Sequence, residues 1–350
     1  MGAPARPDRF ELWDVTVPMR RGLRSATGAI GERRSIVVAV TAGDVTGWGE
    51  AAPVTGHSLD TADEAWTLLA ALAELVVAGD DPAPIEGSTA TSALDAALTD
   101  LAARLEGSPP AVHLGGAMEP VPGSVAIDLP RSEGALLDDV DAAASAGYRH
   151  VKVKIDPASV GHVAAARQRH PGLGIAVDAN GTFDAATADL LVELDAFGLD
   201  YVEQPFPPGA TETTAELRSA LVAPVCLDES VRAIADIPGA VGRADAVALK
   251  PGRLGPTLTR RAIDVAARHG LGVKIGGLVE TGIGRGVLVA FATHPAVTLP
   301  SDLAASDRYF DDDLVVPPWT LLGGNLVPRA TVAVDLSNLR RFATAHAVIT

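Results

Sequence analysis

The chain has 350 residues, of which 47% are hydrophobic, and it carries a formal net charge of −16 at pH 7. Its length exceeds one minimal domain and suits a large barrel with an accessory domain. The negative charge argues against binding to nucleic acid, and no apolar run approaches the roughly 18–20 residues of a transmembrane helix. One cysteine, Cys226, excludes internal disulfides and cysteine-cluster metal sites. The first residues lack an apolar signal-peptide core, so a cytoplasmic protein is expected.

Three strands of an antiparallel sheet are predicted near the start, in residues 9–19, 33–43 and 45–53, from alternating apolar residues bounded by Gly and Pro. The first two are joined by a predicted polar loop from Arg20 to Arg34 with five arginines: Arg20, Arg21, Arg24, Arg33 and Arg34. Such a loop could bind an acidic substrate over a site or be a mobile surface turn. The sequence leaves both readings open.

Helical periodicity follows across residues 60–106, with Asp60 or Thr61 as the start and Gly107 as the stop. We therefore predict an α+β capping domain over residues 1–121. The C-terminal tail, 325–350, carries another apolar stretch and is expected to join this domain. His57, in the loop before the helical stretch, is interpreted as an ordinary loop residue and not as a catalytic one.

Strands and helices alternate from about Pro122 onward. The helices include residues 184–198 and 257–270, and eight strands are predicted near 124–128, 150–155, 174–179, 201–205, 225–229, 246–250, 272–277 and 297–302. Eight such units favour a (β/α)7β TIM-type barrel as the catalytic domain, over residues 122–324. An open doubly wound sheet is the structural alternative.

Lysine usage directs attention to the second of these strands. The chain has four lysines beside 24 arginines, and three of them are Lys152, Lys154 and Lys250. Arg is effectively always protonated, whereas a Lys amine can be desolvated and act as a base. Residues two apart in a strand share a face, so Lys152 and Lys154 project together. The alternative is a solvated edge strand with two surface lysines.

Acidic residues and lysines stand at the carboxyl ends of successive predicted strands, 24, 25, 25 and 22 residues apart: Lys154, Asp178, Glu203, Asp228 and Lys250. In a parallel barrel these ends form one rim, where barrel active sites lie. Three carboxylates make an all-oxygen donor set that suits Mg²⁺, for which Mn²⁺ could substitute.

The two lysine positions lie four strands apart in an eight-stranded barrel, so they face each other across its mouth with the carboxylates between them. A substrate carboxylate on the metal would present one face of its α-carbon to Lys154 and the other to Lys250. The metal would stabilise the enediolate that forms when the α-proton leaves. Nearby cations, including Lys152, would lower the pKa of the base.

The motifs Lys-x-Lys, VDAN, VEQP, LDES and LKPG, in this order and spacing, resemble the enolase superfamily, in its muconate-cycloisomerase-like branch. The segments GGLVETGIGR (276–285) and LPSDLAASDRYF (299–310) are similar to the o-succinylbenzoate synthase/N-acylamino acid racemase group. The resemblance covers nearly the whole chain, including the capping domain and GWGEAAP. It implies a small-molecule carboxylate substrate and a homo-oligomer, with no nucleic-acid or membrane partner.

Residue roles also follow from the resemblance. It implies that Asp178, Glu203 and Asp228 bind Mg²⁺, that Lys154 abstracts the proton, that Lys250 faces it and that Lys152 assists through its charge. Glu229 would then support the third ligand without binding the metal itself. The expected substrate contacts are Arg24, Gly277, Leu278 and Asp302.

Several reactions remain compatible with this set. The leading expectation is a lyase, o-succinylbenzoate synthase, which performs a syn dehydration in menaquinone biosynthesis with Lys154 as the one base. The second is an N-acylamino acid racemase (N-succinylamino acid racemase), in which both lysines exchange protons. A dipeptide epimerase or a muconate-type cycloisomerase follows; an epimerase would be expected to carry Asp-x-Asp where this chain has Asp302 alone. A non-catalytic barrel is disfavoured by the intact set.

Two features stay undecided or minor. Lys274, in the seventh predicted strand, either enters the site or extends outward. GIGRG (282–286) resembles a phosphate loop only superficially and is interpreted as a turn that opens a helix.

Overall fold

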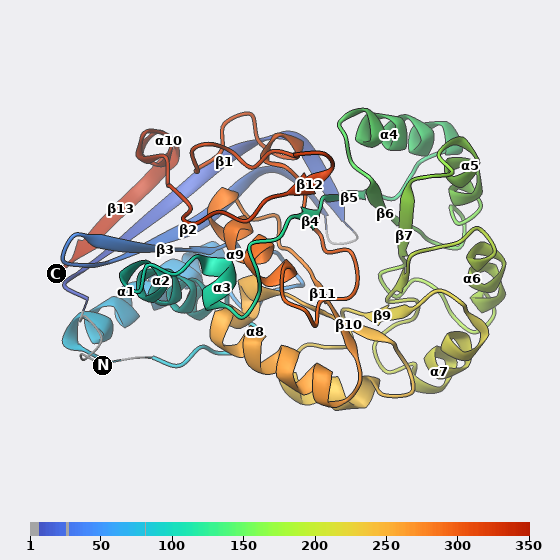
Figure 1. The fold of residues 1–350 in the computed structure, drawn as a ribbon, viewed down its shortest axis with the longest axis horizontal. Helices are drawn as coiled ribbons and strands as arrows, with labels where there is room; N and C mark the ends of the chain where they lie inside the picture. The colour runs from blue at the N-terminus through green and yellow to red at the C-terminus, as the bar shows by residue number, and fades with distance from the viewer. Residues whose placement is uncertain (1–6, 26–27, 81) are drawn as a thin grey trace.

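The computed structural model describes residues 7–25, 28–80 and 82–350. Figure 1 shows an antiparallel sheet with its helices on one side of the molecule and a parallel barrel ringed by helices on the other. The antiparallel sheet has the order β13-β1-β2-β3 and contains the three strands predicted near the start of the chain. Its strands are β1 (Arg9–Ser25), β2 (Gly28–Ala42), β3 (Val45–Ala51) and β13 (Ala343–Ile349).

The predicted loop from Arg20 to Arg34 is largely strand, so that prediction is wrong. After an irregularity beyond Pro18, β1 and β2 resume pairing, with Leu23 opposite Ile30 and Ser25 opposite Gly28. This ladder gives backbone groups partners that a loop would have to find in water. Residues 26 and 27 lie outside the described part of the chain.

The helical stretch predicted over 60–106 is two helices, α1 (Ala62–Ala78) and α2 (Thr89–Leu105). Thr61 caps α1 and exchanges hydrogen bonds with Glu64 in a capping box. Gly79 ends this helix with φ of 99°, a left-handed conformation that glycine adopts at little cost. Pro82 and Pro84 follow, and a helix cannot run through them without losing hydrogen bonds.

The glycines of the GWGE motif allow α2 to pack directly on β3. A Cβ atom at Gly49 would lie 2.0 Å from the carbonyl oxygen of Ala93, and one at Gly47 would lie 2.2 Å from that of Ala97. Both distances are far below van der Waals contact. Glycine is therefore required here by close approach, and the motif fixes α2 against the sheet.

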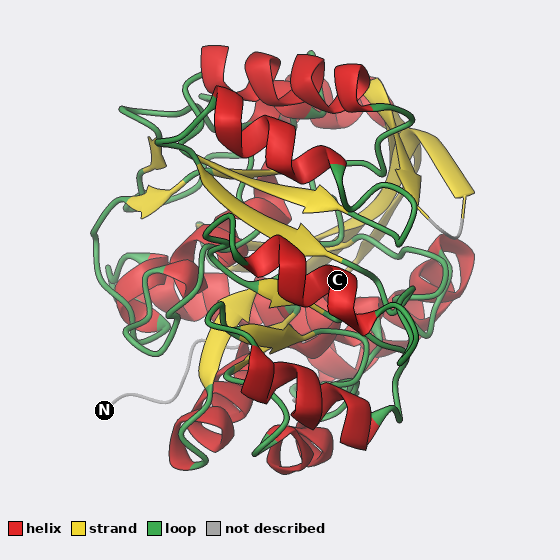
Figure 2. Ribbon diagram, turned by 90° about the vertical axis from the view of Figure 1, so that its right-hand side faces the viewer, coloured by secondary structure: helices red, strands yellow, loops and turns green. Residues whose placement is uncertain are grey.

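Seven parallel strands form the barrel in the order β11-β10-β9-β8-β7-β6-β5, which confirms the predicted TIM-type class. Figure 2 shows the helices outside the strands. The strands are β5 (Ser124–Ile127), β6 (His150–Lys154), β7 (Gly174–Asp178), β8 (Val202–Glu203), β9 (Val225–Leu227), β10 (Ala246–Leu249) and β11 (Gly272–Ile275). The helical segments between and after them are α4 (Glu133–Ser145), α5 (His162–Arg169), α6 (Ala188–Asp195), α7 (Thr211–Ala220), η1 (Ile234–Ala240), α8 (Pro251–Arg268) and α9 (Gly282–Ala292).

The eighth strand, predicted at 297–302, is reduced to a single parallel bridge between Val297 and Val273. The same segment still closes the barrel, because the amide of Asp302 donates to Ile275 and the amide of Ser124 donates to Leu303, each at 2.9 Å. Shorter elements complete the chain: α3 (Pro110–His113), β4 (Val121–Pro122), η2 (Ser306–Arg308), β12 (Asn325–Leu326) and α10 (Leu336–Phe342).

Strand alternation divides the barrel residues between two environments. Outward residues such as Val151, Val153 and Val177 pack against the helices. The inward residues of the lower barrel are mostly small, and they form a cluster of Ala176, Tyr201, Cys226, Ala246 and Ala248. Small side chains leave room above them, and long side chains fill that room.

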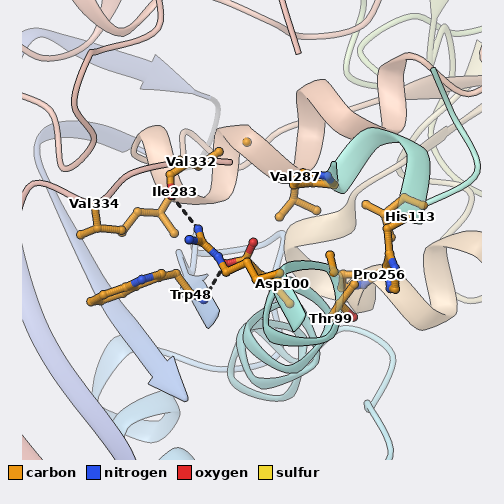
Figure 3. Close-up of a pocket in the computed structure, with 15 residues that line it drawn as sticks. Trp48, Thr99, Asp100, His113, Pro256, Ile283, Val287, Val332 and Val334 are labelled. Carbon is orange, nitrogen blue, oxygen red and sulfur yellow. Dashed lines mark hydrogen bonds and ion pairs between the residues drawn. The ribbon is translucent and has the colours of Figure 1, made fainter. Parts of the chain in front are cut away.

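A cavity of about 500 Å³ lies where the capping domain meets the barrel (Figure 3). Its wall is mostly apolar, and its charged groups are engaged with each other or with backbone. Asp100 pairs with Arg104 at 2.7 Å, and Arg104 also donates to the Val332 carbonyl at 2.7 Å. This cavity belongs to the packing between the domains. No helix among the described residues is both long and apolar enough to cross a membrane.

Candidate active site

A larger cavity, about 1000 Å³ in volume, opens at the carboxyl ends of the barrel strands. Strand ends supply Lys154, Asp178 and Asp228 to its wall, and the capping domain supplies Val54 and His57. Parallel strands present their carboxyl ends on one rim, so residues far apart in sequence meet here. Six of the predicted residues besides the three just named also belong to this site, in its wall or beneath it: Lys152, Glu203, Lys250, Gly277, Leu278 and Asp302.

Lys152 is the hub of a buried ion-pair network. Its Nζ lies 3.1 Å from Asp178, 3.1 Å from Glu203 and 3.1 Å from Asp302, and the side chain is 6% exposed. Burial opposes its charge, but the three carboxylates raise the pKa of Lys152 well above its ordinary value. A Lys held in this state is a fixed cation, which agrees with a charge role and disfavours a role as the base.

Lys274 points into the barrel beneath the cavity and not outward, which settles the question that the sequence left open. It is inward-facing on β11, fully buried, and pairs with Glu203 at 2.9 Å and Asp302 at 2.8 Å. Its amine lies 5.8 Å from the centre of the Tyr201 ring, at the edge of the small inner cluster. Burial opposes its charge, yet Asp302 and Glu203 raise the pKa of Lys274.

Lys250 follows β10 and forms a separate pair on the opposite side of the mouth. Its Nζ donates to both oxygens of Asp228, at 2.7 and 2.5 Å, and both side chains are 6% exposed. Burial disfavours the ionised form of Asp228, but the charge and the hydrogen bond of Lys250 outweigh this effect and lower the pKa of Asp228 to about 2. Lys250 is therefore engaged as a cation.

Lys154 differs from the other three lysines. It is the last residue of β6, is only partly buried and lines the cavity. Among the described residues it has no ion-pair or hydrogen-bond partner for its amine. An amine that faces the cavity without a bound carboxylate is free to meet a substrate, as a general base must.

His57 lies closer to the site than its reading as an ordinary loop residue predicted. It lines the same cavity from the capping domain, and its carbonyl accepts a hydrogen bond from Arg253 at 3.5 Å. Burial, together with Lys250 and Lys154, lowers the pKa of His57 to about 4. The imidazole is therefore neutral at pH 7.

Residues directly after the strands hold the carboxylates in place. The backbone amide of Asn180 donates to Asp178 at 3.1 Å, and its side chain donates to Glu229 at 3.0 Å. Gln204 accepts from the amides of Asp228 and Ser230 at 3.0 and 3.1 Å. Both Asn180 and Gln204 have positive φ, 43° and 38°, which aims these amides into the rim. The signal was present in the sequence, in VDAN and VEQP.

Two carboxyl groups of the site have raised pKa values despite the nearby lysines. Burial is the main cause that raises the pKa of Glu203 to about 7, against the pull of Lys152 and Lys274. Burial, Asp228 and Asp178 raise the pKa of Glu229 as well. Within the described part of the chain, one buried oxygen of Glu229 and one of Asp302 have no hydrogen-bond partner.

A divalent cation fits this donor set chemically. Asp178, Glu203 and Asp228 are buried, lie on adjacent strand ends and offer only hard oxygen donors, the type that Mg²⁺ prefers. In the described residues, however, no three side chains of the His, Cys, Asp and Glu types already surround a point that could hold a metal. Lysine amines sit on these carboxylates instead, so binding would require the amines to give way.

The predicted substrate contacts fall into two sets. Gly277, Leu278 and Asp302 line the cavity, whereas the side chain of Arg24 lies outside what the structure describes, so its role stays a prediction. Two other arginines of that segment serve the fold. Arg34 pairs with Asp14 and Asp63, and Arg20 pairs with Asp311.

Arg33 and Arg285 support the cavity wall through backbone carbonyls, a role that the sequence motifs did not indicate for either residue. Arg33 is buried and donates to the carbonyls of Val279, at 3.1 Å, and Pro53, at 2.8 Å. Arg285 donates to the carbonyls of Ala304 and, at 2.8 Å, Glu280. Val279 has φ of 62°, an unfavourable conformation for a β-branched residue that such bonds help to maintain.

Comparison with known proteins places the chain in a family. Residues 135–331 match the model described as "Enolase C-terminal domain-like", and residues 8–100 match "MenC, N-terminal domain". The chain belongs to the enolase superfamily. An N-succinylamino acid racemase from Amycolatopsis sp. is 35% identical over 335 residues, 90% of each chain. An o-succinylbenzoate synthase from Bacillus subtilis is 28% identical over 366 residues, 98% of each chain.

The fold agrees with this membership. A structure described as a probable mandelate racemase from Alicyclobacillus acidocaldarius superposes with a TM-score of 0.88 at 32% identity, covering 97% of this chain and 98% of that one. The superfamily resemblance read from the strand-end motifs is therefore confirmed, and so is the inference that the chain is an enzyme. The two named relatives catalyse different reactions, which leaves the choice between them to the site.

Proposed function

We propose that this enzyme is an o-succinylbenzoate synthase, which abstracts a proton α to a carboxylate and then eliminates a hydroxyl group. One observation carries the proposal: Lys154 lines the cavity with an amine that no side chain among the described residues engages, so it can act as the base of the dehydration. A syn dehydration needs one base and one fixed cation. The o-succinylbenzoate synthases among the relatives and the MenC-type N-terminal domain support the same choice.

The roles of the residues follow from this assignment. Lys154 takes the α-proton and afterwards protonates the departing hydroxyl on the same face of the substrate. Lys152 and Lys250 are fixed cations that favour negative charge on the substrate carboxylate as the proton leaves. Val54 and His57 of the capping domain line the cavity beside these groups and would limit the access of water to the reaction.

We propose further that Asp178, Glu203 and Asp228 hold Mg²⁺ or Mn²⁺, with Glu229 supporting Asp228 from behind. Family membership and the all-oxygen donor set support this assignment. The ion would supply a Lewis acid that stabilises charge on the substrate carboxylate. We propose likewise that the capping domain ends and the barrel begins at residue 121, and that the enzyme is a homo-oligomer.

N-succinylamino acid racemase is the second candidate, because Lys250 lines the cavity opposite Lys154 and a racemase shows 35% identity. Deuterium exchange separates the two. Wild-type enzyme and the Lys250→Arg variant are incubated in D₂O with (R)- and (S)-N-succinylamino acids separately. Exchange of both enantiomers by the wild type, with exchange of only one surviving in the variant, makes Lys250 a working acid and base. A wild type inert to both, yet fast on the cyclohexadiene precursor of o-succinylbenzoate, supports the lyase.

A further inference from the structure

The fourth lysine has no part in the reaction as described so far. Lys274 is fully buried and does not line the cavity, so it cannot touch a substrate. It nevertheless shares both of its carboxylate partners with Lys152. Asp302 accepts from Lys274 at 2.8 Å and from Lys152 at 3.1 Å, through the same oxygen. Glu203 forms ion pairs with the same two amines at 2.9 and 3.1 Å.

We infer that Lys274 is a positioning residue, which neutralises Asp302 from beneath so that Lys152 stays available to the substrate carboxylate. This inference rests on the proposed function. Lys152 faces three carboxylates, of which Asp178 and Glu203 would also serve a metal ion. If Asp302 had only Lys152 as its counter-charge, that amine would be held at Asp302 and withdrawn from the rim.

The surroundings of Lys274 support a charge role over simple space filling. Nearby inward positions are small: Ala248 is in register with Lys274 on the neighbouring strand, and Ala246 lies two residues earlier, so there is room for a long side chain that an apolar residue could also occupy. Yet the chain places a cation there, against the cost of burying it, and gives it two carboxylates within 3 Å. A cation in this position also makes the site less attractive to a divalent ion.

Charge-balanced substitution tests the inference. Lys274→Met removes the cation with little change of shape, and Lys274→Met/Asp302→Asn restores the original net charge. We expect kcat/KM of the single variant to fall by at least about tenfold, the scale of coupling within one ion-pair network, and the double variant to be at least about threefold more active than the single variant. Activity that the double variant does not regain measures the contact of Asp302 with the substrate. Equal activity of Lys274→Met and wild type, or equal losses in the single and double variants, overturns the inference.

Metal affinity gives a readout that does not depend on turnover. Metal-free proteins are titrated with Mn²⁺ and followed by electron paramagnetic resonance. Lys274→Met should bind Mn²⁺ at least about fivefold more tightly than wild type because a nearby positive charge is gone, and the double variant should match wild type. Unchanged affinity in the single variant contradicts the inference, since a packing role would not alter it.

Two further comparisons distinguish a loss of activity from a loss of folding. Arg167→Met removes a cation that bonds the carbonyls of Phe197, Leu173 and Gly198 far from the rim, so it should lower the melting temperature and leave kcat/KM unchanged. A single variant that fails to fold beside a folded double variant supports the inference, and failure of both overturns it. Wild-type protein inert to both substrate classes refutes only the proposed function, and the Mn²⁺ titration still decides the role of Lys274.

Discussion

Removal of the Lys250 amine should destabilise the metal-free protein far more than removal of a surface cation. In the folded state the pKa of Asp228 is lowered from 3.8 to about 2. At about 1.36 kcal/mol per pKa unit, ionisation of this carboxyl stabilises the folded state by about 2 kcal/mol at neutral pH. In Lys250→Met the carboxylate stays buried without its paired amine, and the loss of one partner of a buried pair costs about 3–5 kcal/mol.

The assay is urea unfolding in EDTA at pH 7, followed by circular dichroism, with Arg218→Met as the matched control. Arg218 pairs with Asp245 at 2.7 Å, but both side chains are more than a third exposed, so the control should lose no more than about 1 kcal/mol. Because the folded pKa of Asp228 is depressed, its contribution is complete above pH 4 and is lost as pH falls through about 2. Equal losses of under about 1 kcal/mol in both variants would refute this reasoning.

Three further predictions concern the metal, Arg24 and His57. EDTA should abolish turnover with the circular dichroism spectrum retained, and Mg²⁺ or Mn²⁺ should restore it; full activity of metal-free protein contradicts the ligand assignment. Arg24→Ala should raise KM more than it lowers kcat, because it removes binding that the ground state and the transition state share. Steady-state kinetics measure both constants. If neither constant changes, residues 277–280 and not Arg24 recognise the substrate. Since the folded pKa of His57 is lowered to about 4, unfolded chains take up its proton first, and stability should fall as pH drops from 6.5 towards 4. Urea unfolding at several pH values measures how the free energy of unfolding depends on pH. This dependence should be weaker in His57→Gln than in the wild type, and an equal dependence in both contradicts the burial of the ring.

The rim of the barrel could be predicted because it follows from spacing alone. Lys154, Asp178, Glu203, Asp228 and Lys250 recur at intervals of one β/α unit, and parallel strands bring such positions to one edge. The pairing of each amine with its carboxylates could not be predicted in this way. It depends on side-chain directions and depths inside the barrel, which one-dimensional spacing does not contain.

The misses have recognisable physical causes. The break between α1 and α2 was signalled by Gly79 and two prolines, which helical periodicity outweighed. The sequence analysis missed the extension of β1 and β2 because polar, Gly-containing segments are typical of loops. The strands pair through their backbones, and this pairing does not depend on the side chains. Lys274 could have been placed by alternation on β11 together with the small inward residues, Ala246 and Ala248.

The most direct test of the account is the rate at which the Mg²⁺-loaded enzyme forms o-succinylbenzoate from its cyclohexadiene precursor, compared with Lys154→Met. The proposal predicts rapid conversion by the wild type and a loss of roughly 10²–10⁴-fold in the variant, the usual contribution of a general base. A wild type that does not convert the precursor, or a variant that converts it as fast as the wild type, would contradict the account.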